Sequence, residues 1–423
     1  MTGRTFNDGF PTLPAGVAGG WGFSAKRTVA LLVVTASVGY VGRTAMTVVA
    51  PGIMGDFHLS QAQMGTVFSA FLVGYTAFQM PSGWLADRVN ARTLFAGVAA
   101  AWAVLTFATA AVGWHGFAAS LSALLLVRAL FGIAAAPTYP ASARTVAVIV
   151  PERLQGSANG AVLSSIGIGS ALTPLLLGAI TVRWGWRTAL VASAAMAAIV
   201  CFLWLASPRI AAHYSQEAKT SRWRDLHNKS FWFLSASYFL QGYVGYIFVF
   251  WFYLYLIQVR HFEVLQASVL TAMPWLFTLI AIPAGGALSD AMVKRWGATW
   301  GRRALPAIAL VGGALFLVVG ARTESATFAV VCLTACTVLV LCTEGPFWAT
   351  MNQICGRHSG AGGGVMNFGS NLGGMISPAL TPWLAGRIGW GAALSLTAGL
   401  AALAGLLWLG VTINDSGHAG GDS

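Results

Sequence analysis

The sequence predicts an all-α membrane protein in which about 12 transmembrane helices form two six-helix bundles. Three observations predict this fold class. Only 9% of the 423 residues are charged and 57% are hydrophobic, whereas soluble proteins carry roughly 25% charged residues. Successive apolar runs approach the length of roughly 20 residues that a helix needs to cross a bilayer. One longer polar stretch divides these runs into two sets of six.

The connections between the apolar runs are short, so we expect neighbouring helices to run antiparallel. The runs cover residues 28–50, 62–84, 93–113, 118–146, 157–182, 187–206, 230–258, 264–288, 304–321, 325–351, 360–386 and 389–411. The predicted organisation is a cytoplasmic tail (1–27), a first bundle (28–206), a cytoplasmic linker (207–229), a second bundle (230–411) and a cytoplasmic tail (412–423).

A short internal repeat supports the division into two bundles. The second run ends in Gly83-Trp-Leu-Ala-Asp87, and the eighth run ends in Gly286-Ala-Leu-Ser-Asp290. The same pattern therefore recurs at the equivalent loop of each half. Two parallel repeats with a binding site between them at the membrane midplane are a known architecture of secondary transporters.

The distribution of basic residues predicts the orientation in the membrane. Most of the 24 Lys and Arg residues fall in loops on one side of the predicted spans, and such loops face the cytoplasm. Both termini are therefore expected in the cytoplasm of a cell with a bacterial-type inner (plasma) membrane. This pattern also explains the net charge of +12 without a nucleic-acid partner.

The sequence gives no reason to expect an enzyme, a cofactor, a metal or ATP. None of the four lysines follows a glycine, so no phosphate-binding G-x-x-x-x-G-K-[ST] loop is present. No H-E-x-x-H or G-x-S-x-G motif occurs either. The pair Cys332 and Cys336 shares a helix face, but two thiols alone favour packing over metal binding. We expect a monomer whose partners are a small solute, lipid and protons.

Two arginines, Arg43 and Arg128, lie inside predicted spans. Burying a guanidinium in a bilayer is costly, so each side chain should face a cavity or a partner. An anion can bridge the two, because the planar guanidinium suits a carboxylate. The alternative is a structural role, as an ion pair or in contact with backbone carbonyls.

Glu344 is the one acidic residue that lies deep in a predicted span. No histidine is found at such a depth, so Glu344 is the best candidate for a proton carrier. The alternative is a static partner for one of the arginines.

The segment Gly83-Trp-Leu-Ala-Asp87-Arg88-Val-Asn-Ala-Arg92 resembles the loop signature G-x-L-[AS]-D-R-x-x-x-R of the major facilitator superfamily. The resemblance implies the major facilitator fold, and a gating role for Gly83, Asp87, Arg88 and Arg92, with Asp290 at the equivalent position of the second half. The alternative is a positively charged loop that only fixes the topology.

A finer resemblance extends over nearly the whole chain. It rests on Tyr40-Val-Gly-Arg43 with Val49-Ala-Pro51, Arg128-Ala-Leu-Phe-Gly132, Ala136-Pro137, Pro140-Ala141, Trp251 with Tyr255-Leu256, Met366-Asn367-Phe368, Asn371-Leu-Gly-Gly374 and Ser377-Pro378. These segments look like the anion:cation symporter family, which includes sugar-acid, sialin and vesicular glutamate transporters. The resemblance implies that Arg43 and Arg128 hold a carboxylate, with Tyr40, Tyr75, Gln241, Asn367 and Asn371 nearby.

The sequence departs from this family at two positions. Many members carry an acid directly before the first-span arginine and another in the fourth span, where this chain has Gly42 and Ala135. Because the family links those acids to proton coupling, coupling has either moved to Glu344 or is absent. The extra acid can also select a solute that carries both an anion and a cation.

Aromatic residues are dense in the seventh span, and two of them, Tyr243 and Tyr246, are candidates to reach a central cavity. The sequence thus predicts a secondary active transporter of a small organic anion, such as a sugar acid or an aromatic acid, that works by proton-coupled symport. One alternative is an uncoupled uniporter or exchanger of an anionic or zwitterionic solute. The other is a solute receptor that does not transport.

Overall fold

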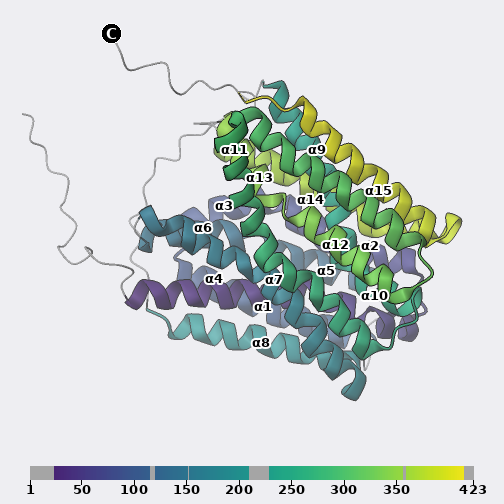
Figure 1. The fold of residues 1–423 in the computed structure, drawn as a ribbon. Helices are drawn as coiled ribbons and strands as arrows, with labels where there is room; N and C mark the ends of the chain where they lie inside the picture. The colour runs from purple at the N-terminus through teal and green to yellow at the C-terminus, as the bar shows by residue number, and fades with distance from the viewer. Residues whose placement is uncertain (1–22, 115–119, 151, 209–227, 356–358, 414–423) are drawn as a thin grey trace, which may run out of the picture.

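The computed structural model describes residues 23–114, 120–150, 152–208, 228–355 and 359–413, and these residues are almost entirely helical (Figure 1). The first half contains α1 (Phe23–Phe57), α2 (Gln61–Ala77), α3 (Gln79–Arg88), α4 (Ala91–Ala111), α5 (Leu121–Ala135), α6 (Thr138–Ile149), α7 (Glu152–Trp184) and α8 (Trp186–Ala206). The second half contains α9 (Lys229–Phe250), α10 (Phe252–Gln258), α11 (Val264–Arg322), α12 (Ala326–Leu341), α13 (Glu344–Cys355), α14 (Ser359–Ile388), α15 (Trp390–Leu407) and a 3₁₀ turn (Trp408–Gly410).

Side-chain caps explain where several helices begin. Ser60 and Gln63 form a capping box at the start of α2, in which each side chain accepts a hydrogen bond from the other residue's backbone N–H. Ser120 and Ser325 cap α5 and α12 by accepting from the backbone N–H three residues later. These caps place polar side chains at the starts of apolar runs, where the chain turns.

Several predicted spans consist of two helices. The run 118–146 is interrupted between α5 and α6 at Ala136 and Pro137, where proline has no N–H to donate. The run 230–258 is interrupted at Trp251, although no proline is present. By contrast, α11 continues for 59 residues through the predicted loop after residue 288, with a change of direction at Gly297, whose φ is 79°.

The two halves pack separately and meet along two seams. In the first half α4 packs against α8, α1 against α7, and α2 against α5; in the second half α9 packs against α14, and α11 against α12 and α15. The seams between the halves are formed by α2 with α14 and by α7 with α11. The major facilitator fold expected from the sequence agrees with this arrangement.

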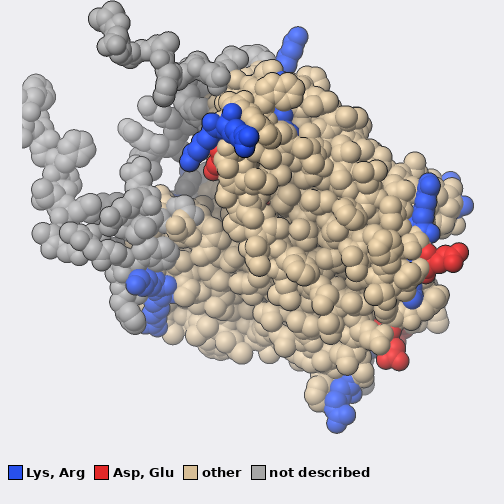
Figure 2. Space-filling model, in the orientation of Figure 1, with Lys and Arg blue, Asp and Glu red and all other residues tan. Residues whose placement is uncertain are grey.

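The surface has the distribution expected of a membrane protein. On the face shown in Figure 2, charged side chains gather at two opposite ends and leave a broad uncharged band between them. Among the described residues, nine helices are long and apolar enough to cross a membrane, with the 59 residues of α11 counted as one helix. The number of twelve spans therefore stays a prediction. The predicted tails and the linker lie largely outside the described residues.

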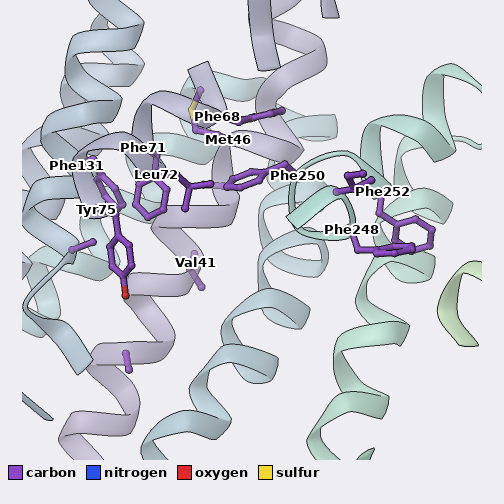
Figure 3. Packing of buried hydrophobic residues seen from close by; sticks show 14 of the residues in the cluster. Val41, Met46, Phe68, Phe71, Leu72, Tyr75, Phe131, Phe248, Phe250 and Phe252 are labelled. Carbon is purple, nitrogen blue, oxygen red and sulfur yellow. The ribbon is translucent and has the colours of Figure 1, made fainter. Parts of the chain in front are cut away.

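The halves touch at the end of the molecule where α1 gives way to α2. There the Gln61 side chain on α2 donates to the side chain of Gln258, the last residue of α10, at 2.7 Å. Two turns further along α2, the Phe68 and Phe250 rings stack with centroids 5.1 Å apart (Figure 3). Gly65 lies so close to the carbonyl of Pro378 on α14 that a Cβ would clash with it. We call this the closed end.

The opposite end carries α3 and α6 and the turn at Val89 and Asn90, and we call it the motif end. In the described part of the chain, α3 and α6 pack against helices of their own half and not extensively against the second half. In Figure 1 the two halves diverge toward this end. Among the described residues, α3 and α6 therefore make no extensive contact between the halves at this end.

Candidate functional site

Arg43 lies in the middle of α1, between the two halves, and its side chain is only 6% exposed. Four aromatic rings surround the guanidinium, with centroids 4.9–5.5 Å from its central carbon: Phe71 at 4.9 Å, Tyr246 at 5.0 Å, Tyr40 at 5.2 Å and Tyr75 at 5.5 Å. Ring faces attract a cation electrostatically. They leave the in-plane N–H groups of Arg43 free to bind an acceptor.

The partners of Arg43 are neutral hydroxyl groups. Nη2 donates to the Tyr246 hydroxyl at 2.6 Å, and Nη1 donates weakly to the Tyr40 hydroxyl at 3.4 Å. Nε has no partner in the structure. The ion pairs seen in the described part of the chain join Arg187 to Asp56 and Arg302 to Asp290, so Arg43 has no carboxylate partner there.

Arg128 lies on α5, and its side chain is 2% exposed. Its Nη2 donates to the carbonyl of Arg43 at 3.2 Å, and its Nη1 lies 3.5 Å from the carbonyl of Gly42. The Phe131 and Phe71 rings cover its guanidinium. In this conformation Arg128 therefore binds the backbone of α1 at the turn that carries Arg43.

Tyr246 connects Arg43 to the second half. Its hydroxyl accepts from Arg43 and donates to the Asn371 side-chain oxygen at 2.8 Å. Asn371 in turn donates to the backbone carbonyl of Asn367, one turn earlier on α14. Gly374 allows the Tyr246 ring to lie directly on α14, because a Cβ there would overlap the ring. A chain of hydrogen bonds thus runs from α1 through α9 to α14.

Glu344 forms a second polar centre, at the start of α13 in the second half. Its Oε1 accepts from the Gln241 amide at 2.8 Å and its Oε2 accepts from the Tyr238 hydroxyl at 2.8 Å. Both donors come from α9 and both are neutral. Among the described residues Glu344 has no basic partner within ion-pair distance, and its side chain is partly exposed.

The remaining predicted tyrosines divide between the two halves. Tyr75 stacks on Phe71 with centroids 5.8 Å apart and faces Arg43 (Figure 3). Tyr243 lies elsewhere, because its hydroxyl is paired with Thr381 at 2.9 Å within the second half. The structure therefore brings together Tyr40, Arg43, Tyr75, Tyr246 and Asn371 and places Tyr243 apart from them.

Sequence reasoning missed two tyrosines that lie beside the predicted site. Tyr238 binds Glu344, and Tyr139 on α6 packs edge-on against Tyr40 and is paired with Ser165 at 3.3 Å. The residue spacing held a signal for the first, because Tyr238 and Gln241 are three residues apart and share a helix face. No signal in the sequence pointed to Tyr139.

The predicted gating residues lie at the motif end. Arg92 donates to the carbonyl of Leu205, and Arg144, which was not predicted, donates to the carbonyl of Ala86. Gly83 lies within α3, and Arg88 is its last residue. The side chain of Asp87 lies outside the described structure.

The equivalent position of the second half forms a polar cluster around the buried side chain of Arg302, with Asp290 exposed. Arg302 donates to the Asp290 carboxylate at 2.6 Å and to the Ser289 hydroxyl at 3.1 Å through Nη1. Its Nε donates to the Gln353 side chain on α13 at 3.2 Å. This cluster ties the bend at Gly297 in α11 to α13.

Taken together, these contacts form a site with two charges of opposite sign on opposite halves. Arg43, on α1, presents a cation whose partners are neutral, and Glu344, on α13, presents an acid whose partners are neutral. A solute between the halves could bind both halves at once. The arrangement suits an anionic solute whose binding is linked to the relative movement of the halves.

The chain matches known proteins over most of its length. Residues 31–367 match the family model described as Major Facilitator Superfamily. The chain is 30% identical to a hexuronate transporter of Bacillus subtilis, over 87% of this chain and 90% of that protein. It is 27% identical to a D-galactonate transporter of Escherichia coli, over 90% and 94% of the two chains. It is 29% identical to a "Probable sulfoacetate transporter" of Cupriavidus necator, over 83% and 85%.

Solved structures share the fold at lower identity. A bacterial homologue of the lysosomal transporter Spinster, in an inward-facing and occupied conformation, superposes with a TM-score of 0.78 at 19% identity, over 93% of this chain and 97% of that chain. A D-xylose–proton symporter superposes with a TM-score of 0.71 at 16% identity, over 90% and 97%. These similarities confirm the fold class that the sequence predicts.

Proposed function

Because the chain belongs to the Major Facilitator Superfamily, we propose that it is a secondary transporter that carries a small organic anion across a cell's inner membrane by alternating access. The observation that carries this proposal is the state of Arg43. Its guanidinium lies between the two halves, ringed by aromatic faces and bonded to neutral hydroxyls. A buried cation without a carboxylate partner is suited to an anion that comes and goes.

The names of the relatives support the substrate class. Hexuronate, D-galactonate and sulfoacetate are all organic anions. We propose a monocarboxylate or a similar small acid as the solute, with its anionic group on Arg43. The hydroxyls of Tyr40, Tyr75 and Tyr246 and the amide of Asn371 would then hydrogen-bond the remaining oxygens of the solute.

Arg128 has a different role in this proposal. Its guanidinium already donates to two carbonyls of α1, which is the structural alternative considered from the sequence. We propose that it fixes the backbone that carries Arg43 and adds positive charge to the site. Arg43 makes the direct contact with the solute.

The asymmetry of the two ends supports alternating access. Gln61, Phe68 and Gly65 close one end against the second half. If the basic motif end faces the cytoplasm, as the positive-inside rule favours, the conformation described here is inward-facing. We propose this orientation, with both termini in the cytoplasm, twelve spans in two bundles, and a monomeric carrier.

The energy source in this proposal is a proton gradient, with Glu344 as the residue that binds the proton. The alternative is an uncoupled uniporter or exchanger, and one observation favours it. A Cβ at Gly42 would lie 2.9 Å from the Phe131 ring, so an acid at the position where the resembled family carries one would require this ring to move. Glu344 is then the one acid among the described residues near the site that can take a proton.

Uptake by purified protein in lipid vesicles tests the function. Vesicles containing the wild-type protein should accumulate a labelled sugar acid, such as D-galactonate or a hexuronate, when a pH gradient is imposed. Arg43→Ala should remove uptake while the protein keeps its thermal unfolding temperature. Tyr243→Phe, which alters a hydroxyl away from the site, is the matched control and should transport normally. Uptake by Arg43→Ala at the wild-type rate would overturn the proposed site.

A further inference from the structure

The polar centre at Glu344 has a feature that transport of a simple anion does not need. Glu344 is an acid in the interior of a membrane protein, and only neutral groups bind it. A buried carboxylate is stabilised chiefly by a positive partner, and neutral donors repay only part of its desolvation. The described residues supply no such partner within 4 Å. A proton or a cationic group of the solute can supply that positive charge.

The geometry of Glu344 leaves room for an incoming group. A carboxylate has about four acceptor positions on its two oxygens, and here the side chains of Gln241, Tyr238 and Trp348, all neutral, hydrogen-bond to it. The side chain is partly exposed and not sealed into the core. About one acceptor position of the carboxylate thus stays open to a donor from solvent or solute.

The elements around Glu344 bring few other titratable groups. From α9 comes Tyr238, which donates to it, and from α1 comes Tyr40, close enough to interact electrostatically. From α11, Gly286 lies opposite Gly345 at the start of α13. The nearest basic group that α11 brings to α13 is Arg302, which binds Gln353 at the far end of that helix.

The distance between Arg43 and Glu344 follows from the positions of their partners along α9. On α9, Tyr246 binds Arg43, while Gln241 and Tyr238 bind Glu344. These residues lie five and eight positions apart, which corresponds to roughly 8–12 Å along the helix axis at 1.5 Å per residue. A solute with its anionic group on Arg43 can therefore reach Glu344 with its other end if it is a few carbons long.

We infer that Glu344 takes one positive charge whenever the carrier is loaded: a proton when the solute is a simple anion, and the solute's own ammonium group when the solute is a zwitterion. Small amino acids with separated charges are then substrates of the same site. This inference rests on the proposed function, because it assumes that the anionic group binds at Arg43. It makes the number of protons bound depend on the solute.

The charge balance can be stated for each solute. A monoanion binds together with a proton on Glu344, so the pair adds no net charge to the site. A zwitterion brings its own cation, and its ammonium group occupies the place of that proton. Binding of the zwitterion must therefore leave one proton fewer on the protein than binding of the monoanion, whatever the protonation of Glu344 in the empty carrier.

Calorimetry on the purified full-length protein tests the inference. The probes are ω-amino carboxylates of three to six carbons, each compared with the ω-hydroxy carboxylate of the same length. Titrations in two buffers of different ionisation enthalpy give the number of protons exchanged on binding. For at least one length, the amino compound should bind, and the two proton counts should differ by about one.

Two variants locate the effect. Glu344→Gln should abolish the difference in proton count and weaken the amino compound at least tenfold, about 1.4 kcal/mol, while the hydroxy compound changes less than threefold. Glu263→Gln, an exposed acid at the start of α11, is the matched control and should behave as wild type. The wild-type proton counts decide the question even if Glu344→Gln does not fold.

The outcomes separate the inference from the proposed function. Suppose that the hydroxy compounds bind and that their binding needs Arg43. If the amino compounds then bind no more tightly than the hydroxy compounds, or exchange the same number of protons as they do, the inference is wrong and the anion carrier stands. If no compound in either series binds, and no labelled sugar acid enters vesicles, the proposed function fails with it.

Discussion

Arg43 and Tyr246 are joined by a 2.6 Å hydrogen bond although 203 residues separate them in the chain. Arg43 belongs to α1 in the first half and Tyr246 to α9 in the second half. The bond thus joins the proposed binding residue directly to the opposite half. A solute that takes over the N–H groups of Arg43 must compete with Tyr246, so binding and the contact between the halves are linked.

This relationship predicts the effect of Tyr246→Phe. The substitution removes one bond between the halves, worth about 1 kcal/mol, and so shifts the balance of conformations about fivefold. The maximal rate of uptake should change several-fold, while the solute concentration for half-maximal uptake changes less than threefold. Uptake kinetics in vesicles measure both quantities.

Tyr243→Phe is the control for this experiment, because it makes the same change on the same helix. The Tyr243 hydroxyl is paired with Thr381 inside the second half, so its loss should leave both kinetic quantities near the wild-type values. If the two variants behaved alike, the bond between the halves would have no part in the transport cycle.

Arg128 is predicted to stabilise the fold around Arg43. Arg128→Ala removes two hydrogen bonds to carbonyls of α1, each worth about 1 kcal/mol, and it also removes the packing of the guanidinium against Phe71 and Phe131. The thermal unfolding temperature should fall clearly, whereas in Arg43→Ala it should change little. Thermal unfolding followed by tryptophan fluorescence makes the comparison. An Arg128→Ala protein as stable as wild type, but unable to bind the solute, would identify Arg128 as a direct ligand.

The close contact at Gly65 predicts that a single methyl group can shift the conformational balance. A Cβ at this position would overlap the carbonyl of Pro378 on α14. Gly65→Ala should therefore disfavour closure of this end and lower the uptake rate. The distance between spectroscopic labels at Gln61 and Gln258, which are hydrogen-bonded across the halves, should lengthen.

Gly97→Ala is the matched control for Gly65→Ala. Gly97 is also in a helix, and a Cβ there would meet nothing within 4 Å. The label distance and the uptake rate should both match wild type. An unchanged label distance in Gly65→Ala would show that the contact at Pro378 does not limit closure.

Glu344 is predicted to be required for accumulation driven by a pH gradient but not for exchange of one anion for another. In Glu344→Gln the site keeps an acceptor and a donor of similar shape but can no longer bind a proton. Accumulation driven by a pH gradient should be lost, whereas exchange of labelled for unlabelled anion at equal pH should continue at a rate within about threefold of wild type. Accumulation at the wild-type level would remove Glu344 as the coupling residue.

The sequence was sufficient to predict the fold, and it pointed to several residues of the candidate site. The low proportion of charged residues and the length of the apolar runs follow from the properties of the bilayer, which act on every span separately. The cost of burying charge singled out Arg43, Arg128 and Glu344 without any structure. Local rules of this kind apply wherever a residue's environment depends on its own segment.

Contacts between distant segments could not be predicted in this way. Nothing in the spacing of residues indicates that Arg43 meets Tyr246, or that Arg128 binds the carbonyls of Gly42 and Arg43. The helix interruption at Trp251 is another example. Its indole N–H donates to the carbonyl of Pro378 on α14 at 2.9 Å, so a partner more than a hundred residues away accompanies the break.

The neutral surroundings of Arg43 have an electrical consequence for the empty carrier. Two arginines and one ionised glutamate leave a net charge of about +1 near the middle of the membrane, and a monoanion that binds together with a proton leaves this charge unchanged. One elementary charge crossing 100 mV is worth about 2.3 kcal/mol. A membrane potential that is negative inside would therefore hold the site toward the cytoplasm in the empty carrier and in the carrier loaded with a monoanion and a proton, so outward movement of the site should be slowed by the potential in both states.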